Sequence, residues 1–178
     1  MQTSVPATSE ATQPTAEIVL PLPGQYSEAH QGWYAGIQTA ADGQSAWHVI
    51  LPDAPEYYIQ DIAWGTCGQK MTGADSDRDG LGNTKSMAVQ GSLLAQSILA
   101  LPGDCYLPSR NESALLYATC REHIETGYLY WTSTQYSADD AWGQGFGYGY
   151  QGNDDKSYEG RARAVRRLPL QTFSPLVG

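Results

Sequence analysis

Glycine occupies every second position of the stretch Trp142-Gly-Gln-Gly-Phe-Gly-Tyr-Gly-Tyr150, and aromatic or amide side chains fill the positions between. In an extended chain, successive side chains point to opposite faces. The pattern therefore predicts a strand with one face of bare backbone and one crowded face. Because glycine weakens a strand interior, its repetition indicates that another backbone or a ligand approaches the bare face. We expect this segment to present a surface and not to carry acid–base chemistry.

The segments on either side of this stretch predict a sheet built from both halves of the chain. The turn signal Asp42-Gly43 between two apolar runs predicts a hairpin. A short apolar run at 18–23 is expected to be a strand or an edge segment, and 52–83 is expected to be rich in loops. The remaining expected strands are 33–37, 46–51, 128–134, 141–151 and 161–168.

Two helices are expected between these groups of strands. The first starts after a cap at Asn83 or Thr84, ends at Pro102-Gly103, and has an apolar stripe made of Met87, Gly91, Leu94, Ile98 and Leu101. The second begins with the capping box Ser109-Arg-Asn-Glu112 and has a buried face made of Leu115, Leu116, Thr119 and Cys120. Strands, two helices and strands again predict an α+β fold, with the helices packed on an antiparallel sheet.

The length of 178 residues suffices for one domain with a core of its own. Residues 1–16 are mostly Thr, Ser, Ala, Pro and Gln, and they offer little apolar surface for burial. We therefore expect an extended N-terminal arm over 1–16, which is either flexible or ordered against a neighbour in an assembly. The folded domain is expected over 17–178.

Charge and hydropathy narrow the possible partners. The net charge is −9, and phosphate contacts need a basic field, so no nucleic-acid partner is expected. No apolar run approaches the ~20 residues that cross a bilayer, and the start of the chain lacks a secretory signal pattern. We expect that the chain is made in the host cytoplasm and that it does not insert into a membrane. The three cysteines, Cys67, Cys105 and Cys120, are expected to be reduced, packed thiols.

Several motifs occur in a consistent order over residues 20–170: Gly32-Trp-Tyr-Ala-Gly36, Asp79-Gly-Leu-Gly-Asn-Thr84, Leu107-Pro-Ser-Arg-Asn-Glu112 with Leu115-Leu-Tyr117, Tyr130-Trp-Thr-Ser-Thr-Gln135, Phe146-Gly-Tyr-Gly-Tyr-Gln151 and Arg161-Ala-Arg-Ala-Val-Arg-Arg167. In these motifs the chain resembles the DUF1566 domain of bacteriophage and prophage proteins. The resemblance implies a C-type-lectin-like fold. Related lectin-like folds include phage tropism-determining proteins, in which C-terminal strands and loops display the receptor-contacting residues.

A receptor-binding surface is therefore expected over 134–158. Core packing is the favoured interpretation of Phe146 and Trp142, whereas core packing and ligand contact remain equal alternatives for Tyr136, Tyr148, Tyr150 and Tyr158. Polar residues of the neighbouring loops are expected to form a rim around the aromatic face. The predicted binding residues are Gln135, Tyr136, Asp139, Asp140, Trp142, Gln144, Tyr148, Tyr150, Asn153, Asp154, Lys156 and Tyr158.

The segment Asp75-Ser-Asp-Arg-Asp-Gly80 begins like a calcium-binding loop, because Asp75, Asp77 and Asp79 occupy its first, third and fifth positions. Ser86 stands at the twelfth position, where such a loop needs a bidentate Glu. A solvated acidic turn that leads into a helix cap is the favoured interpretation. A weak calcium site is the alternative, and no other cofactor is expected.

The arginine-rich segment is interpreted as a source of ion pairs. On one strand, Arg161, Arg163 and Arg167 would share a face, and their expected partners are carboxylates such as Glu112 or Glu159. Catalysis lacks a basis, because His30, His48 and His123 fall on different expected elements and no Ser or Cys has an evident base partner. Formylglycine-generating enzymes share the broad fold but use a C-terminal cysteine pair, and here Ala162 and Ala164 stand in the similar strand.

Together these observations predict a non-enzymatic phage virion protein, a tail-fibre or tail-tip component that recognises a host glycan or protein. The alternative is a structural accessory or decoration subunit that holds other virion proteins. The N-terminal arm is expected to bind other virion proteins in either case. Homotrimeric assembly is what analogy with phage fibres implies.

Overall fold

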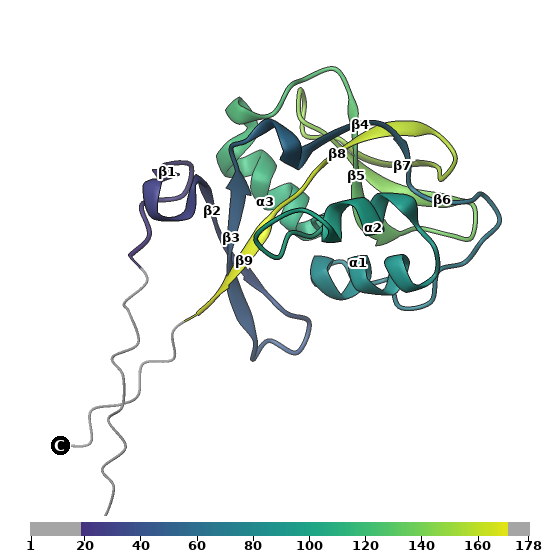
Figure 1. Cartoon of the computed structure of the whole chain (residues 1–178), viewed down its shortest axis with the longest axis horizontal. Helices are drawn as coiled ribbons and strands as arrows, with labels where there is room; N and C mark the ends of the chain where they lie inside the picture. Colours follow the sequence, from purple (N-terminus) through teal and green to yellow (C-terminus); the bar gives the residue numbers. More distant parts are fainter. Residues whose placement is uncertain (1–18, 171–178) are drawn as a thin grey trace, which may run out of the picture.

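Two β-sheets and three α-helices make up an α+β structure (Figure 1). The computed structural model describes residues 19–170, so the predicted arm over 1–16 lies outside the described residues. In chain order the main elements are β1 (Tyr26–Ser27), β2 (Gly32–Thr39), β3 (Ala46–Pro52), β4 (Tyr58–Ala63), α1 (Gly80–Val89), α2 (Leu93–Leu99), α3 (Arg110–Cys120), β5 (Leu129–Gln135), β6 (Asp140–Gly145), β7 (Gln151–Asp155), β8 (Glu159–Arg163) and β9 (Arg166–Pro169).

The first sheet has the strand order β1-β2-β3-β9, and each neighbouring pair is antiparallel. The predicted hairpin is confirmed, because β2 pairs with β3 with Trp33 opposite Leu51. At its turn, Asp42 Oδ1 accepts hydrogen bonds from the backbone N–H groups of Gln44 and Ser45. The strand predicted at 18–23 is wrong over its described part, 19–23, which forms turns and irregular chain before β1.

The second sheet has the strand order β4-β8-β5-β6-β7, with one parallel pair, β5 and β8. Strand β4 falls inside the 52–83 region that the sequence predicted to be loop-rich. The pairing of β4 with β8 is irregular between Ile59 and Ile62, and Asp61 has a positive φ of 50°. This irregularity breaks the two-residue alternation by which a strand is recognised in sequence.

The predicted strand at 161–168 is divided between the two sheets. Strand β8 belongs to the second sheet and β9 to the first. Between them, Val165 forms an isolated antiparallel bridge with Tyr106, and the backbone N–H of Ala164 donates to Tyr57 O at 2.9 Å. Figure 1 shows β8 and β9 as one nearly continuous yellow path from the right-hand sheet to the left-hand one.

The first predicted helix is in fact two helices. Helix α1 starts three residues before the predicted caps, because Asp79 is its N-cap and accepts from the Gly82 N–H at 3.0 Å. Gly91 has a positive φ of 93°, which ends the first helix, and Ser92 then caps α2. The predicted capping box of α3 is confirmed, since Ser109 Oγ accepts from the Glu112 N–H and Glu112 Oε2 accepts from the Ser109 N–H.

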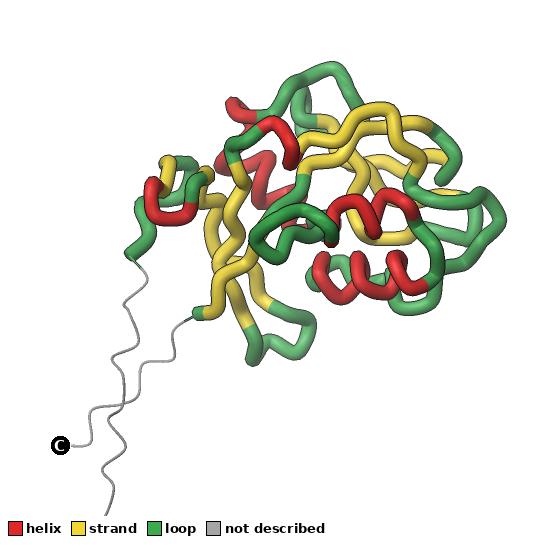
Figure 2. Tube along the Cα trace, viewed as in Figure 1, coloured by secondary structure: helices red, strands yellow, loops and turns green. Residues whose placement is uncertain are grey.

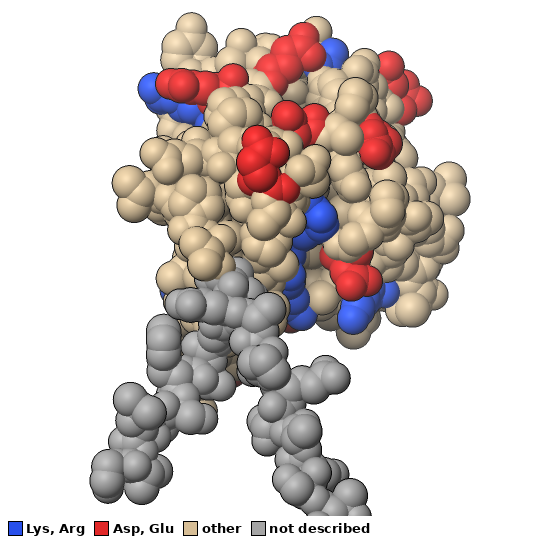
Figure 3. All heavy atoms as spheres, turned by 60° about the vertical axis from the view of Figure 1, so that its left-hand side comes forward, with Lys and Arg blue, Asp and Glu red and all other residues tan. Residues whose placement is uncertain are grey.

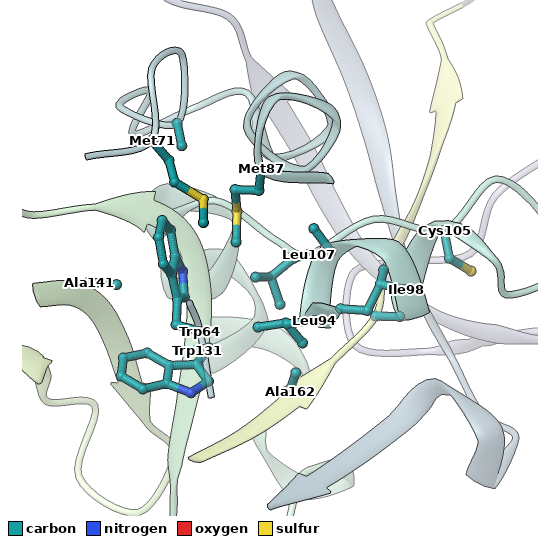
Figure 4. Packing of buried hydrophobic residues seen from close by; sticks show 13 residues of the cluster. Trp64, Met71, Met87, Leu94, Ile98, Cys105, Leu107, Trp131, Ala141 and Ala162 are labelled. Carbon is teal, nitrogen blue, oxygen red and sulfur yellow. The ribbon is translucent and has the colours of Figure 1, made fainter. Parts of the chain in front are cut away.

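The apolar side chains form two core clusters. One cluster joins α1 and α2 to the second sheet, and Figure 4 shows the indoles of Trp64 and Trp131 in it near Met71 and Leu94. The other cluster includes Val49, Leu116 and Val165 and joins α3 to the first sheet. Helix α3 contacts β2 and β3 as well as β5 and β6, so it lies between the sheets (Figure 2).

Candidate functional site

The glycine-rich stretch forms a hairpin tip and not the single strand predicted at 141–151. Strand β6 ends at Gly145, the chain turns over residues 146–148, and β7 starts at Gln151. The Gly145 N–H donates to Tyr150 O at 2.8 Å and closes this turn. Gly149 has a positive φ of 74°, and a Cβ there would lie 2.6 Å from the Tyr117 ring. The alternating glycines therefore do not line one face of a strand.

The three aromatic side chains of this hairpin tip differ in their burial. Phe146 points into the core, where its ring packs edge-to-face on Tyr130 with 5.3 Å between centroids. This confirms the expectation of core packing for Phe146. Tyr148 is 97% exposed and Tyr150 is 71% exposed, so both rings lie at the surface. For these two tyrosines core packing is therefore wrong, and ligand contact stays a prediction.

Tyr128, Tyr148 and Tyr150 border an open groove of about 600 Å³, which we call the tyrosine groove. Its other lining residues are Thr126, Gly127, Leu129, Gly145 and Gly147. Leu129 lies directly opposite Gly145 in the β5–β6 ladder, which brings the two segments together. None of these lining residues, all within the described chain, carries a charge. Tyr128 was not among the predicted binding residues, because only the pairing of β5 with β6 places it here.

The other predicted aromatic residues lie outside the lining of the groove. Tyr136 is exposed and packs edge-to-face on Trp142, with 5.2 Å between centroids. The Arg110 guanidinium lies 3.7 Å above the Trp142 ring, so Trp142 is half-buried by packing. Tyr158 is exposed and packs against the edge of Trp131. Tyr136, Trp142 and Tyr158 were predicted to share a surface with Tyr148 and Tyr150, but they do not line the tyrosine groove.

The predicted polar rim lies at the far end of the same hairpin. Asp140 pairs with Asp155 and Ala141 with Asp154, whereas Gln144 and Gln151 pair next to the glycine-rich tip. Asp139, Asn153 and Asp154 are exposed at or near that far end. These acidic and amide side chains therefore lie at the opposite end of the hairpin from Tyr148 and Tyr150.

Lys156 contradicts its expected place in an exposed rim, because its side chain is fully buried. The Nζ donates to Gln69 O, Ala138 O and Gln135 Oε1, each at 2.8 Å. It also lies 5.0 Å from the centroid of the Trp64 ring. Burial lowers the pKa of Lys156 from its usual value. Lys156 therefore holds loops together and offers no contact to a ligand.

The two predicted glutamines are also structural. Gln135 is buried, accepts from the Met71 N–H at 2.7 Å, and donates to Asp75 Oδ1 at 3.0 Å. Gln144 is buried at the hairpin tip and donates to Gly145 O at 2.9 Å. The sequence does not show whether the amide side chain of a Gln in a strand is buried or exposed, because it can hydrogen-bond to the protein or to water.

The acidic segment leads into a helix cap, as the favoured interpretation of the sequence predicted. Asp79 caps α1 and also pairs with Arg167 at 3.2 Å. Asp75 and Asp77 are exposed, and Asp75 accepts from Gln135. Among the described residues, no group of three His, Cys, Asp or Glu side chains is arranged to hold a metal ion.

Two of the three arginines form ion pairs, but with other partners than predicted, whereas Arg163 donates to the carbonyl oxygen of Pro52 at 2.9 Å. Arg161 pairs with Glu125 and stacks on Tyr128, and Arg167 pairs with Asp79. Glu112 is buried and accepts from Tyr106 OH at 2.6 Å instead of from an arginine. On the face shown in Figure 3, acidic side chains form several separate patches, and basic side chains lie in a narrow column low in the view and at a few places near its edges.

A larger pocket lies elsewhere, between the β2–β3 hairpin, α1 and β9. Its volume is about 830 Å³, and its lining includes Trp47, Asp79, Lys85, Asp104, Cys105 and Arg167. Burial raises the pKa of the Cys105 thiol to about 11, so that thiol is protonated near neutral pH. No local pattern in the sequence indicates this pocket, because its walls come from segments that are distant in the sequence.

Two of the histidines contact aromatic side chains. His48 Nδ1 is 2.9 Å from Tyr34 OH, and His123 stacks on Trp33 with 3.4 Å between centroids. Cys105 and Cys120 are buried free thiols, as expected, but Cys67 is exposed, which corrects the prediction that all three are packed. A hydrogen bond with Asp155 raises the pKa of the Cys67 thiol to about 11.

Comparison with known proteins adds no assignment: the chain matches no model of a protein family, and it matches no curated protein. Within the described residues, none of the helices combines the length and apolar character that a bilayer crossing needs.

Proposed function

We propose that the chain is a non-enzymatic bacteriophage virion protein, in a tail fibre or tail tip, that recognises the host surface through the tyrosine groove. We also propose that its α+β fold is of the C-type-lectin-like type. The DUF1566-like motifs and the arrangement of α3 between two sheets support this part of the proposal. A fold alone does not define a function, so the site must carry the rest.

The observation that carries the proposal is the exposure of Tyr148 and Tyr150 at a hairpin tip. An almost fully exposed ring adds little to the stability of the fold, because burial of apolar area is what stabilises it. Tyr offers a large apolar body with a polar hydroxyl, a combination enriched in binding surfaces. Two such rings beside Tyr128 and around a groove indicate a surface that becomes covered by a partner.

In this proposal, several copies of the chain act together. The N-terminal arm binds other virion proteins, and a homotrimeric fibre presents several tyrosine grooves to one cell. Linked sites raise the effective concentration for each further contact, so a weak single-site affinity suffices for attachment. The ligand is a glycan or a protein of the host surface.

Whole-cell binding tests the proposal. The purified chain is expected to bind host cells, and the double variant Tyr148→Ala with Tyr150→Ala is expected to lose binding while keeping its melting temperature. The matched control is Val89→Ala with Leu93→Ala, because these side chains are 85% and 73% exposed on α1 and α2. This control variant is expected to bind cells as the wild type does.

Two results would contradict the proposal. If the tyrosine variant binds cells as well as the wild type, the tyrosine groove is not the recognition surface. If the wild type binds no cells but is captured tightly by a virion subunit through the same tyrosines, the protein is an accessory or decoration subunit instead.

A further inference from the structure

Gly145 and Gly147 are the two described glycines whose lack of a side chain is not explained by the fold. Each of the other described glycines either has a positive φ or would place a Cβ closer than 3.4 Å to another atom. At Gly147 the nearest atom to a Cβ would be Thr126 Cβ, at 3.9 Å. At Gly145 it would be Tyr150 O, at 3.6 Å, which is ordinary contact.

Alanine at these two positions would therefore fit the folded state without strain. Alanine also restricts the unfolded chain more than glycine does, so it favours folding wherever the native conformation accepts it. Glycine at both positions thus brings a small loss of stability with no gain inside the chain. Both glycines line the tyrosine groove, and the atoms nearest to an added Cβ, Tyr150 O and Thr126 Cβ, belong to other residues of the same lining.

We propose that Gly145 and Gly147 form the floor of a binding site for a neutral sugar ring, with Tyr128, Tyr148 and Tyr150 as its walls. This inference rests on the proposed recognition function and names its ligand class. The apolar C–H face of a pyranose packs on an aromatic ring, and the bare floor lets its edge approach the backbone. The volume of about 600 Å³ lies in the range of small-ligand sites.

The charges around the groove favour a neutral ligand over an anionic one. The residues that line the groove carry no charge, although the whole chain has a net charge of −9. Arg161 is the cation that stacks on Tyr128, and Glu125 pairs with it. A carboxylate or phosphate in the groove would find no free cation among the lining residues and would lose hydration without compensation.

Polar groups suited to sugar hydroxyls are present at the same place. Within the described chain, no hydrogen bond engages the hydroxyls of Tyr148 and Tyr150. Thr126 adds a third hydroxyl to the lining. Ring faces with free hydroxyls at their ends allow stacking and hydrogen bonding to one sugar, which is the combination that fixes a ligand's orientation.

Saturation-transfer difference NMR tests the inference on the purified chain. The probes are the methyl glycosides of glucose, galactose, mannose, rhamnose and N-acetylglucosamine, with glucuronic acid and sialic acid as anionic probes. At least one neutral glycoside is expected to bind, with the strongest transfer to protons on one face of its ring. The Gly147→Ala variant is expected to weaken that binding by about tenfold, as an added methyl group does in a fitted site.

Gly91→Ala is the matched control, because it adds the same methyl group in open space. Gly91 has a positive φ of 93°, so this substitution strains the backbone. It is expected to lower the melting temperature and to leave sugar binding unchanged. Gly147→Ala is expected to show the reverse, with an equal or higher melting temperature and weaker binding.

The outcomes separate this inference from the proposed function. If Gly147→Ala and the wild type bind the sugar with equal affinity, the glycines do not form the floor of the site. Cell binding that depends on Tyr148 and Tyr150, but with only anionic probes or none of the probes bound, would overturn the neutral-sugar assignment and leave the recognition function in place. Neutral-sugar binding that depends on Gly147, without any cell binding, would support the site and contradict host attachment.

Discussion

The indole Nε1 of Trp47 lies 2.9 Å from Glu112 Oε1, and this hydrogen bond joins β3 to α3 across 65 residues of sequence. The same carboxylate accepts from Tyr106 OH at 2.6 Å and from the backbone N–H groups of Ser109 and Gly80 at 2.8 and 3.2 Å. Glu112 is fully buried. One side chain thus closes a capping box and also connects the first sheet to the starts of two helices.

We expect the substitution Glu112→Ala to lower the free energy of unfolding by about 3 kcal/mol or more, because it leaves buried donors without an acceptor. Urea unfolding followed by circular dichroism measures this change. Glu122→Ala is the control, since Glu122 is exposed and its loss should change stability by no more than about 0.5 kcal/mol. Equal stability of the two variants would show that the Glu112 network contributes little.

Stability is expected to depend on pH through the same residue. Burial raises the pKa of Glu112, and hydrogen bonds from Tyr106 and from Ser109 and Trp47 oppose that shift. A carboxyl group whose pKa is higher in the folded state stabilises the fold below the unfolded pKa and loses this contribution as pH rises through the folded pKa. The stability of the wild type relative to Glu112→Gln should therefore fall as pH rises above the ordinary pKa of a Glu side chain, about 4.3. A difference that grows with pH would contradict this direction.

Lys156→Met is expected to destabilise the protein without a direct effect on ligand binding. The substitution leaves Gln69 O, Ala138 O and Gln135 Oε1 without their donor, which costs about 2 kcal/mol or more. Thermal unfolding measures the loss, and Lys70→Met at an exposed position is the control. If the folded variant loses cell binding, Lys156 contributes to recognition after all, which would contradict this expectation.

Asp79 is expected to act as a helix cap and not as a calcium ligand. Asp79→Ala should lower the free energy of unfolding by about 1 kcal/mol. Asp79→Asn should lower it less, because Asn also caps helices. Some loss should remain in Asp79→Asn, since Asn cannot form an ion pair with Arg167. Urea unfolding compares the two variants. Addition of calcium or of a chelator is expected to leave the melting temperature of the wild type unchanged. A rise in melting temperature with calcium would support a calcium site in this segment.

Local signals identified the elements that depend on local interactions. The Asp42-Gly43 turn and the capping box at Ser109 act over a few residues, so the sequence showed the hairpin and the start of α3. The same reasoning failed at 141–151, since a run of alternating glycines fits both a strand and a turn. It also failed at Lys156, where the acceptors are carbonyl groups of distant loops.

The sequence by itself determined the α+β class, the β2–β3 hairpin, the cap of α3 and the inward position of Phe146, because turn chemistry, capping and apolar character act within short segments. Only the tertiary structure decided that β8 and β9 belong to different sheets and that Lys156 is buried. It alone also brought Tyr128 beside Tyr148 and Tyr150 around two glycines. The pairing of β5 with β6 makes that arrangement, and such pairing depends on contacts between distant segments that no local pattern records.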